Sequence, residues 1–424
     1  MHKVMLAALL YLLSSSAIAA EWHVSGDLRE RYQSFDNLNF NNSANNNSWE
    51  INSRLYIKAK GEWDNGFSVF LQPQAVHTLL HTQAAGSVNL SQVDLLQAYI
   101  QHHVGDTTIT LGRQQLVYGD QRLLGHLGWK DVARTFDGIK ASYNKDNIKV
   151  DAFAVHPADI VRMTPSTTNT SGDSLVTWSH RNLLGVYATY TQQPKTGVDV
   201  YVINWNHSSN ANVAPNSNIN TYGLRAFGKW HHIDATAEAV FQSGDWLSGV
   251  SQQASAYAFK AGYSLDTWNT RFGFEYDYSP GDDKTNATTH KNFVFPFHTN
   301  HAHYGEMDRF SWANMKNIRL SVKTSPSKAL TLMGNVHFLS LDKATGDWLN
   351  VVGTSSLYAG NPSYTETDAG TEMDLKVVYK IASVKGLKIV GNYSVFNPGA
   401  AVKERNGGIA DQASFAYLIA QYVF

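Results

Sequence analysis

The sequence predicts an all-β protein: a transmembrane antiparallel β-barrel of about 18 strands with short periplasmic turns and long extracellular loops. Three observations favour this fold class. Apolar and polar residues alternate along most of the chain, short and long connections alternate between these segments, and aromatic residues recur at one end of them. A soluble two-sheet β-protein would explain the alternation of residues, but neither the connection lengths nor the aromatic positions.

The N-terminal segment has the features of a secretory signal peptide. Lys3 supplies a basic region, residues 4–13 are apolar, and residues 17–19 form a small-x-small cleavage signal. The apolar run is too short to cross a bilayer, and no later run approaches about 18 uninterrupted apolar residues. We therefore expect residues 1–19 to be a signal peptide and residues 20–424 to form a single outer-membrane barrel domain.

The composition fits a wall with one face in lipid and the other in water. Aromatic residues make up 12% of the chain and charged residues only 16%. The balance of 34 basic and 35 acidic residues gives no global attraction to nucleic acid. Because the chain contains no cysteine, an exported protein of this sequence must be stable without disulfides, and hydrogen-bonded closure of a barrel is a substitute.

The strand-like segments begin directly after the signal peptide. Residues 21–35 place polar and apolar side chains on opposite faces with a period of two, and residues 50–63 repeat the pattern. Later segments of roughly 9–14 residues do the same, the length a tilted strand needs to cross an outer membrane. The weakest segments lie between residues 67 and 117, where Pro73 and Gly112 indicate bulges.

The connections between these segments alternate in length. Short connections rich in turn residues are expected at 64–66, 144–147, 193–195 and 325–327. Long connections are expected at 36–48, 79–92, 118–133, 157–180, 208–219, 244–253, 280–315, 342–369 and 398–412. Such alternation is typical of barrels with periplasmic turns and extracellular loops. Because the loops at 118–133 and 280–315 mix aromatic with charged residues, we expect them to fold over or into the lumen.

Aromatic residues mark the short-turn end of the strands. Amphipathic rings belong at the level of the lipid headgroups, so these positions predict an aromatic girdle. The last strand, residues 414–424, ends on Phe424 and is expected to close the barrel at the same interface. The predicted girdle residues are Trp22, Trp63, Tyr143, Tyr190, Trp230, Tyr263, Trp268, Tyr379 and Tyr422.

The inward-facing charges predict a water-filled, anion-preferring channel. A barrel of this size keeps an aqueous lumen, and guanidinium groups pair bidentately with carboxylates without losing their charge. Acidic neighbours would keep the arginines from holding an anion too tightly. The alternative, that these charges only pair across strands within the wall, stays open. The expected pore-lining or substrate-binding residues are Arg29, Arg31, Arg54, Lys58, Arg113, Arg134, Lys140, Arg225, Glu238, Arg271, Arg319, Glu372, Asp374 and Lys376.

Three stretches resemble the alginate-export-type outer-membrane proteins. LGRQQLVYGDQRLLGHLGWKDVARTFDGIKASY, at 111–143, is similar to that family's GRQ…YGDxRL…W…R-x-FDG signature. GTEMDLKVVYK and LKIVGNYSVFNPG, within 370–399, resemble its E-x-D…Y and FxPG segments, and FPFHTNHAHYGEMDRF, at 295–310, resembles a loop of its wider members. The resemblance implies an 18-stranded barrel through which alginate or a similar uronate polymer leaves the cell. It also implies that Arg54, Arg113, Arg134, Glu372 and Asp374 match positions of the family's conduit.

The expected function is therefore passive export of an anionic, alginate-like polysaccharide, with no enzymatic activity, catalytic residue or cofactor. Expected partners are the polysaccharide or another anionic solute, outer-membrane lipid and periplasmic secretion proteins, and no nucleic acid. Two alternatives stay open: an uptake porin for small anionic or sugar nutrients, and a barrel-embedded hydrolase or acyltransferase. The spacing of His298, His301 and His303 with Glu306 and Asp308 could hold a transition metal, but the resemblance favours packing of this loop over the pore mouth.

Overall fold

A computed structural model describes residues 20–42, 46–82, 91–158, 181–207, 217–283, 288–295, 297–351 and 356–424. The predicted signal peptide, residues 1–19, lies outside these residues. Within them, no helix is long and apolar enough to cross a membrane.

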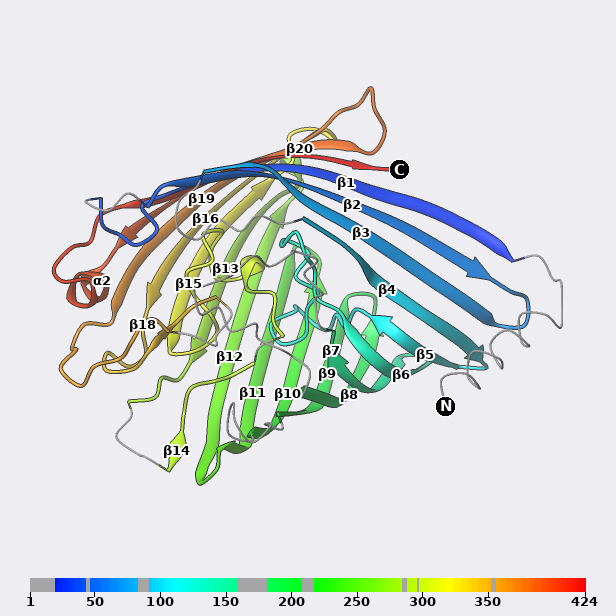
Figure 1. Cartoon of the computed structure of the whole chain (residues 1–424), viewed down its shortest axis with the longest axis horizontal. Coiled ribbons are helices and arrows are strands. Elements are labelled where there is room, and N and C mark those ends of the chain that lie inside the picture. The colour runs from blue at the N-terminus through cyan, green and yellow to red at the C-terminus, as the bar shows by residue number, and fades with distance from the viewer. Residues whose placement is uncertain are drawn as a thin grey trace.

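Eighteen antiparallel strands form one closed barrel, as predicted (Figure 1). The first nine are β1 (Glu21–Asp36), β2 (Ser48–Glu62), β3 (Phe67–His81), β4 (Ser91–Val104), β5 (Thr107–Gln114), β6 (Phe136–Lys145), β7 (Ile148–Pro157), β8 (Arg181–Gln193) and β9 (Thr196–His207). The others are β10 (Ser217–Trp230), β11 (Ile233–Leu247), β12 (Val250–Leu265), β13 (Thr270–Ser279), β15 (Met315–Thr324), β16 (Leu330–Ser340), β19 (Asp368–Lys380), β20 (Leu387–Pro398) and β21 (Ala413–Val423).

Short elements lie in the connections. β14 (Thr289–His290) pairs in parallel with the start of β12, and β17 (Trp348–Leu349) pairs with β18 (Ser356–Tyr358). The short helices are η1 (Thr267–Asn269), η2 (Asn300–Ala302) and α2 (Ala400–Arg405).

The barrel closes where the last strand meets the first, as the terminal aromatic residue predicted. β21 pairs with β1 from Asp27↔Val423 to Asp36↔Ser414. Beyond the ladder, the amide nitrogen of Gly26 donates to the carbonyl oxygen of Phe424 at 2.8 Å. A Cβ atom on Gly26 would lie only 2.2 Å from Cζ of Phe424, so the glycine leaves the space in which the terminal ring packs.

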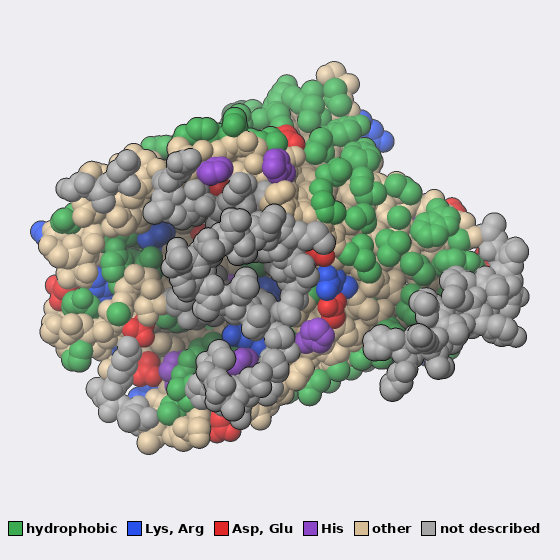
Figure 2. All heavy atoms as spheres, viewed as in Figure 1, with side chains coloured by type: hydrophobic (Ala, Val, Ile, Leu, Met, Phe, Trp, Pro, Cys, Tyr) green, Lys and Arg blue, Asp and Glu red, His purple; other side chains and the backbone are tan. Residues whose placement is uncertain are grey.

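The two faces of the wall differ in chemistry as the period of two predicts. Leu224, Phe272 and Leu375 are among many outward apolar side chains about half exposed to the surroundings of the barrel. Eight of the nine predicted girdle residues are 37–62% exposed, and Trp63 is half-buried. Figure 2 shows hydrophobic side chains gathered at the upper right, with most charged and histidine side chains at the centre and left of the view. Such an apolar band with aromatic girdles is the lipid-facing surface of an outer-membrane barrel.

The strand bounds agree with the predicted alternation of short and long connections with one correction, while most of the predicted loops at 79–92, 157–180 and 208–219 lie outside the described residues. β11 ends at Leu247 and β12 begins at Val250, so the predicted long loop at 244–253 is wrong. Both strands simply continue as a paired ribbon, with Gly249 at a φ of +79° in the turn. The bulge at Pro73 is confirmed by a register shift. The bulge at Gly112 is wrong, because the ladder continues through it and the glycine instead adopts a φ of +127°.

The hydrophobic core lies inside the barrel, toward the long-loop end. It combines inward residues of the strands, such as Phe136 and Phe415, with loop residues such as Leu124, Phe297 and Trp348. Inward side chains at the short-turn end, such as Lys58, are exposed instead. The connecting segments therefore fill the lumen on the long-loop side, and the other half forms an open vestibule.

Candidate functional site

Two loops occupy the long-loop half of the lumen. The inner loop is residues 115–135, between β5 and β6, and the second loop is residues 280–314, between β13 and β15. Both were expected to fold over or into the lumen, and their contacts with the inner wall confirm this. In Figure 1 the cyan inner loop and the yellow second loop run within the barrel.

Three arginines gather on the inner wall where β1 and β2 pair. Arg29 lies directly opposite Arg54, and Arg31 lies opposite Asn52 in the same ladder. These side chains share a face because inward positions recur every second residue. We call Arg29, Arg31 and Arg54 the arginine triad. Its members are only 4%, 2% and 5% exposed, so their mutual repulsion is poorly screened and requires acidic or other acceptor groups.

Asp131 of the inner loop supplies that acceptor. Its Oδ1 lies 2.5 Å from Nη2 of Arg29, and its Oδ2 accepts from Nη2 of Arg31. Oδ2 also accepts from Nδ2 of Asn52 at 3.0 Å. Arg54 instead pairs with Asp27 of the wall, at 3.0 Å between Nη2 and Oδ1. Two guanidinium groups of the triad and the side-chain amide of Asn52 thus hold one loop carboxylate.

Backbone carbonyl groups next to Asp131 complete the contact. The carbonyl oxygen of Trp129 accepts from Arg31 at 2.8 Å and from Arg29 at 3.1 Å. The carbonyl oxygen of Gly128 accepts from Arg54 at 3.1 Å. The tip of the inner loop therefore presents several oxygen atoms to the triad, as a chain of carboxylate and hydroxyl groups would.

The start of the inner loop is bound to the opposite wall. Oδ1 of Asp120 lies 2.6 Å from Nη2 of Arg225 on β10, and Oδ2 pairs with Lys260 on β12. Burial alone would raise the pKa of Asp120, but Lys260 and Arg225 lower it to about 2. β10 is the ninth strand from β1 in either direction around the barrel. The inner loop therefore crosses the lumen.

Arg122 anchors the same end more deeply. Its Nη1 lies 2.9 Å from Oδ1 of Asp277, and its Nη2 pairs with Glu275; both carboxylates belong to β13. Nη1 also donates to Oη of Tyr304 in the second loop at 3.0 Å. Burial would lower the pKa of Arg122, but Asp277 and its neighbours raise it, so the guanidinium stays charged. This end is enclosed by wall and second loop together.

The second loop supports the tip of the inner loop through His301. The imidazole ring stacks on Trp129 with ring centroids 4.0 Å apart, and its Nε2 lies 2.9 Å from Oε2 of Glu306. Nδ1 lies 3.3 Å from Oδ2 of Asp308. Burial lowers the pKa of His301, but the carboxylates of Asp308 and Glu306 raise it above its usual value overall. His301 therefore connects the two loops, with its ring on Trp129 of the inner loop and its nitrogen atoms beside carboxylates of the second loop.

Four other predicted arginines, Arg113, Arg225, Arg271 and Arg319, pair with carboxylates outside the triad. Nε of Arg113 lies 2.8 Å from Oδ1 of Asp137, and Arg319 pairs with Glu275. Nε of Arg271 donates to Oδ2 of Asp234 at 2.8 Å. The structure therefore brings Arg29, Arg31 and Arg54 together, and leaves the arginines of β5, β10, β13 and β15 apart from them.

The remaining predicted residues lie in the inner loop or on the strands, outside the triad. Arg134 belongs to the inner loop and donates to the carbonyl oxygen of His298 at 2.9 Å. Glu238 accepts from Oη of Tyr201 at 2.7 Å, and the fully buried Glu372 accepts from the amide of Met307 at 2.8 Å. The others are Asp374, which accepts from Oγ of Ser394 at 2.6 Å, Lys376, which pairs with Glu306, the half-buried Lys140 and the exposed Lys58.

Sequence reasoning missed Asp131 and Arg122 as functional candidates. Both lie within the stretch quoted for its family resemblance, which was the one available signal.

The three loop histidines do not converge: His298 contacts the carbonyl oxygen of Val351, and His303 that of Asp120. In the described part of the chain, no three His, Cys, Asp or Glu side chains are placed to hold a metal ion.

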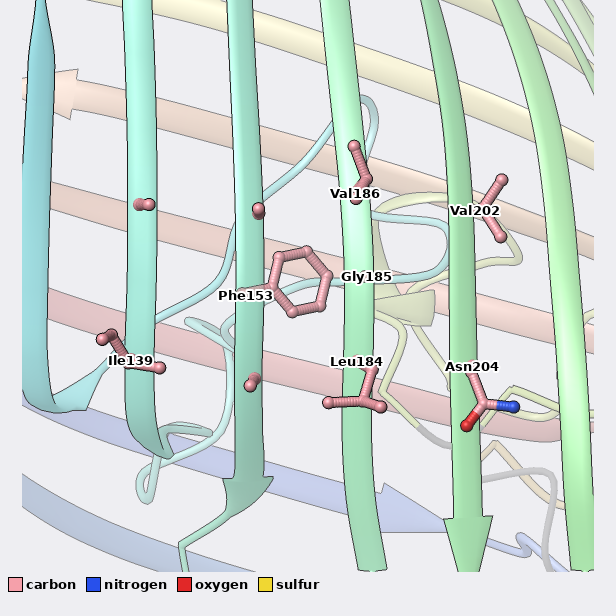
Figure 3. A pocket seen from close by; sticks show the side chains of 10 residues that line it. Ile139, Phe153, Leu184, Gly185, Val186, Val202 and Asn204 are labelled. Carbon is pink, nitrogen blue, oxygen red and sulfur yellow. The ribbon is translucent and has the colours of Figure 1, made fainter.

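A surface groove lies away from this cluster. It is an open groove of about 520 Å³ on the wall of β6 to β9, where small outward residues such as Ala152 lie between Ile139 and Leu184. Figure 3 shows the ring of Phe153 beside Gly185 within that wall. Because its lining is apolar and belongs to the lipid-facing band, the groove lacks the convergent polar groups of a solute site.

Comparisons with known proteins agree with the fold and the quoted motifs. The family model described as Alginate export matches residues 21–415. The structure is similar to Pseudomonas aeruginosa OccK9 (OpdG), with a TM-score of 0.67, 13% identity, and coverage of 95% of this chain and 98% of that one. It is also similar to P. aeruginosa OccK2 (OpdF), solved in complex with glucuronate, with a TM-score of 0.63, 10% identity, and coverage of 95% and 98%. P. aeruginosa OprD gives a TM-score of 0.62, 12% identity, and coverage of 95% and 94%. No curated protein matches this chain in sequence.

Proposed function

Because this chain belongs to the alginate export family and forms an outer-membrane β-barrel channel, we propose that it passes an anionic, alginate-like polysaccharide out of the cell. Transport is passive: the wall and the loops offer charges and a path, and the polymer's own concentration gradient drives it. Lumenal arginines carry the selectivity, because guanidinium groups recognise the carboxylate that every uronate residue bears.

The observation that carries this proposal is the carboxylate held by the triad. Arg29 and Arg31 bind the two oxygens of Asp131 from one wall, in a setting almost free of water. A site that accepts an aspartate carboxylate has the charge and the donor geometry for a uronate carboxylate as well. The glucuronate complex of OccK2 is a case of a similar barrel that binds a uronate.

The other inward cations form the approach to the triad in this proposal, and the inward acids belong to the wall. Lys58 is exposed on the vestibule side of β2, two inward positions from Arg54. Such charges raise the local concentration of anions and speed their entry. The proposed approach and wall residues are Lys58, Arg113, Arg134, Lys140, Arg225, Glu238, Arg271, Arg319, Glu372, Asp374 and Lys376.

A second function, uptake of small anionic or sugar nutrients, is favoured by the filled lumen. The inner loop and the second loop together occupy the long-loop half of the barrel. A narrow path beside them would suit a small solute without any movement of the loops. Liposome swelling separates the two functions, because a nutrient porin passes mono- and disaccharides freely and a closed polysaccharide channel does not.

Planar-bilayer recording of the purified protein tests the proposal. In a salt gradient the wild-type pore should select anions, and uronate tetrasaccharides should block it more strongly than neutral tetrasaccharides. Arg29→Gln with Arg31→Gln should bring the two blocking constants together, because the charged donors are lost. Lys145→Gln, at the exposed short-turn pair with Asp106, is the matched loss of one cation outside the lumen. Cation selectivity of the wild type would contradict the proposal.

A further inference from the structure

We infer that Asp131 is an intramolecular occupant of the arginine triad, and that a cargo carboxylate opens the lumen by taking its place. This inference rests on the proposed function for the identity of the cargo. It adds a gating step: the tip of the inner loop, Gly128 to Asp131, leaves the wall when an external uronate binds where it was.

The start and the tip of the inner loop are held by different contacts. Asp120 and Arg122 are enclosed by carboxylates and cations of β10, β12 and β13 and by Tyr304 of the second loop. The tip, in contrast, is bound to the barrel wall through the side chains of the triad and Asn52, and its Trp129 packs on His301 and Tyr417 without an ion pair. Release of the tip therefore requires a competitor for the triad and separation of Trp129 from these two rings, while Asp120 and Arg122 keep the start of the loop attached.

The triad retains unused capacity for an anion. Among the described residues, Nε of each triad arginine is buried without a hydrogen-bond partner. The three guanidinium groups pair with two carboxylates, Asp131 and Asp27, and Glu50 supplies a third negative charge beside Asn52. A ligand with more acceptor atoms than one aspartate can satisfy these donors. A uronate oligosaccharide has a carboxylate and several hydroxyl groups on each residue, and so competes favourably.

The competition has a measurable consequence. A ligand that binds only molecules with a free triad has an apparent dissociation constant equal to its intrinsic constant divided by the free fraction. If the tip occupies the triad in nine of ten molecules or more, removal of Asp131 should tighten uronate binding by about tenfold or more. A residue that merely stabilised the fold would weaken binding when removed.

Two substitutions at one position test this in the full-length protein. Asp131→Asn removes the charge, and Asp131→Lys adds repulsion from the triad, which also overcomes the carbonyl contacts of Gly128 and Trp129. Conductance should rise from wild type through Asp131→Asn to Asp131→Lys. The dissociation constant for a uronate tetrasaccharide should fall about tenfold or more in Asp131→Asn, with no change for a neutral tetrasaccharide. Asp106→Asn, in the exposed pair with Lys145, is the matched control.

A measurement on the wild type removes dependence on the variants' folding. Hydrogen–deuterium exchange at residues 126–133 should quicken when the uronate tetrasaccharide is added, and stay unchanged with the neutral one. Unchanged conductance in both Asp131 variants, or unchanged exchange with bound uronate, would overturn the gating step. A uronate that neither binds nor blocks while the variants do conduct more would overturn the proposed cargo instead.

Discussion

Replacement of Arg122 by methionine should cost the protein far more stability than loss of an ordinary ion pair. Arg122 has a side chain only 1% exposed, and its partners Glu275 and Asp277 are equally buried. Methionine fills similar space without a charge. Removal of one partner of a buried pair typically costs about 3–5 kcal/mol, because the remaining charge stays buried and uncompensated.

The structure indicates which remaining charge carries that cost. Glu275 keeps Arg319 as a partner, whereas among the described residues Asp277 keeps the amide of Asn317, at 2.8 Å, and no cation in an ion pair. Asp277→Asn in the Arg122→Met background should therefore restore much of the loss, because the uncompensated charge is gone. Glu275→Gln in the same background should restore less.

Urea unfolding of the barrel in lipid vesicles, followed by tryptophan fluorescence, measures these free energies. The matched control is Arg271→Met, because the Arg271–Asp234 pair is 32% exposed on both sides and such pairs contribute at most about 1 kcal/mol. An Arg122→Met loss no larger than that of Arg271→Met would refute the view that Arg122 anchors the inner loop.

Three further predictions concern the seam, the loop contact and the lumen. Gly26→Val should destabilise the closed barrel by about 1–3 kcal/mol, because the new side chain overpacks against Phe424. Urea unfolding measures this loss, and Phe424→Ala in the same background should relieve it. Equal stability of Gly26→Val and wild type would contradict the packing at the seam. The raised pKa of His301 means that its contacts with Glu306 and Asp308 are complete below about pH 6.5 and are lost as pH rises through the folded-state value. Channel noise should therefore increase with pH, and His301→Gln should abolish that dependence; a pH profile unchanged by the substitution would count against it. The share of anion selectivity that comes from exposed vestibule cations such as Lys58 should sharpen at low salt and fall toward 1 M, where the Debye length is about 3 Å. Selectivity independent of salt would contradict a water-filled vestibule.

The barrel could be predicted from sequence because its signals are local. The period of two places Arg29 and Arg54 on the inner face, and turn residues between neighbouring segments bring those strands into one ladder. The hairpin at Gly249 was missed, since nothing in a polar segment distinguishes a loop from strands that extend beyond the membrane.

The contents of the lumen could not be predicted in the same way. Arg29 and Asp131 are 102 residues apart, and the path of the inner loop between them follows no repeating pattern. A count of inward charges therefore predicted an arginine-lined channel, but could not show that a loop carboxylate holds the triad. Arg225 and Arg319 were likewise placed inward correctly, but their partners Asp120 and Glu275 required the folded structure.

A crystal structure of the wild-type barrel with a bound uronate tetrasaccharide tests the central claim most directly. We expect a sugar carboxylate within hydrogen-bond distance of Arg29 and Arg31, with Asp131 displaced from both and Arg122 still between Glu275 and Asp277. A tetrasaccharide bound elsewhere, with Asp131 still paired to the triad, would contradict it.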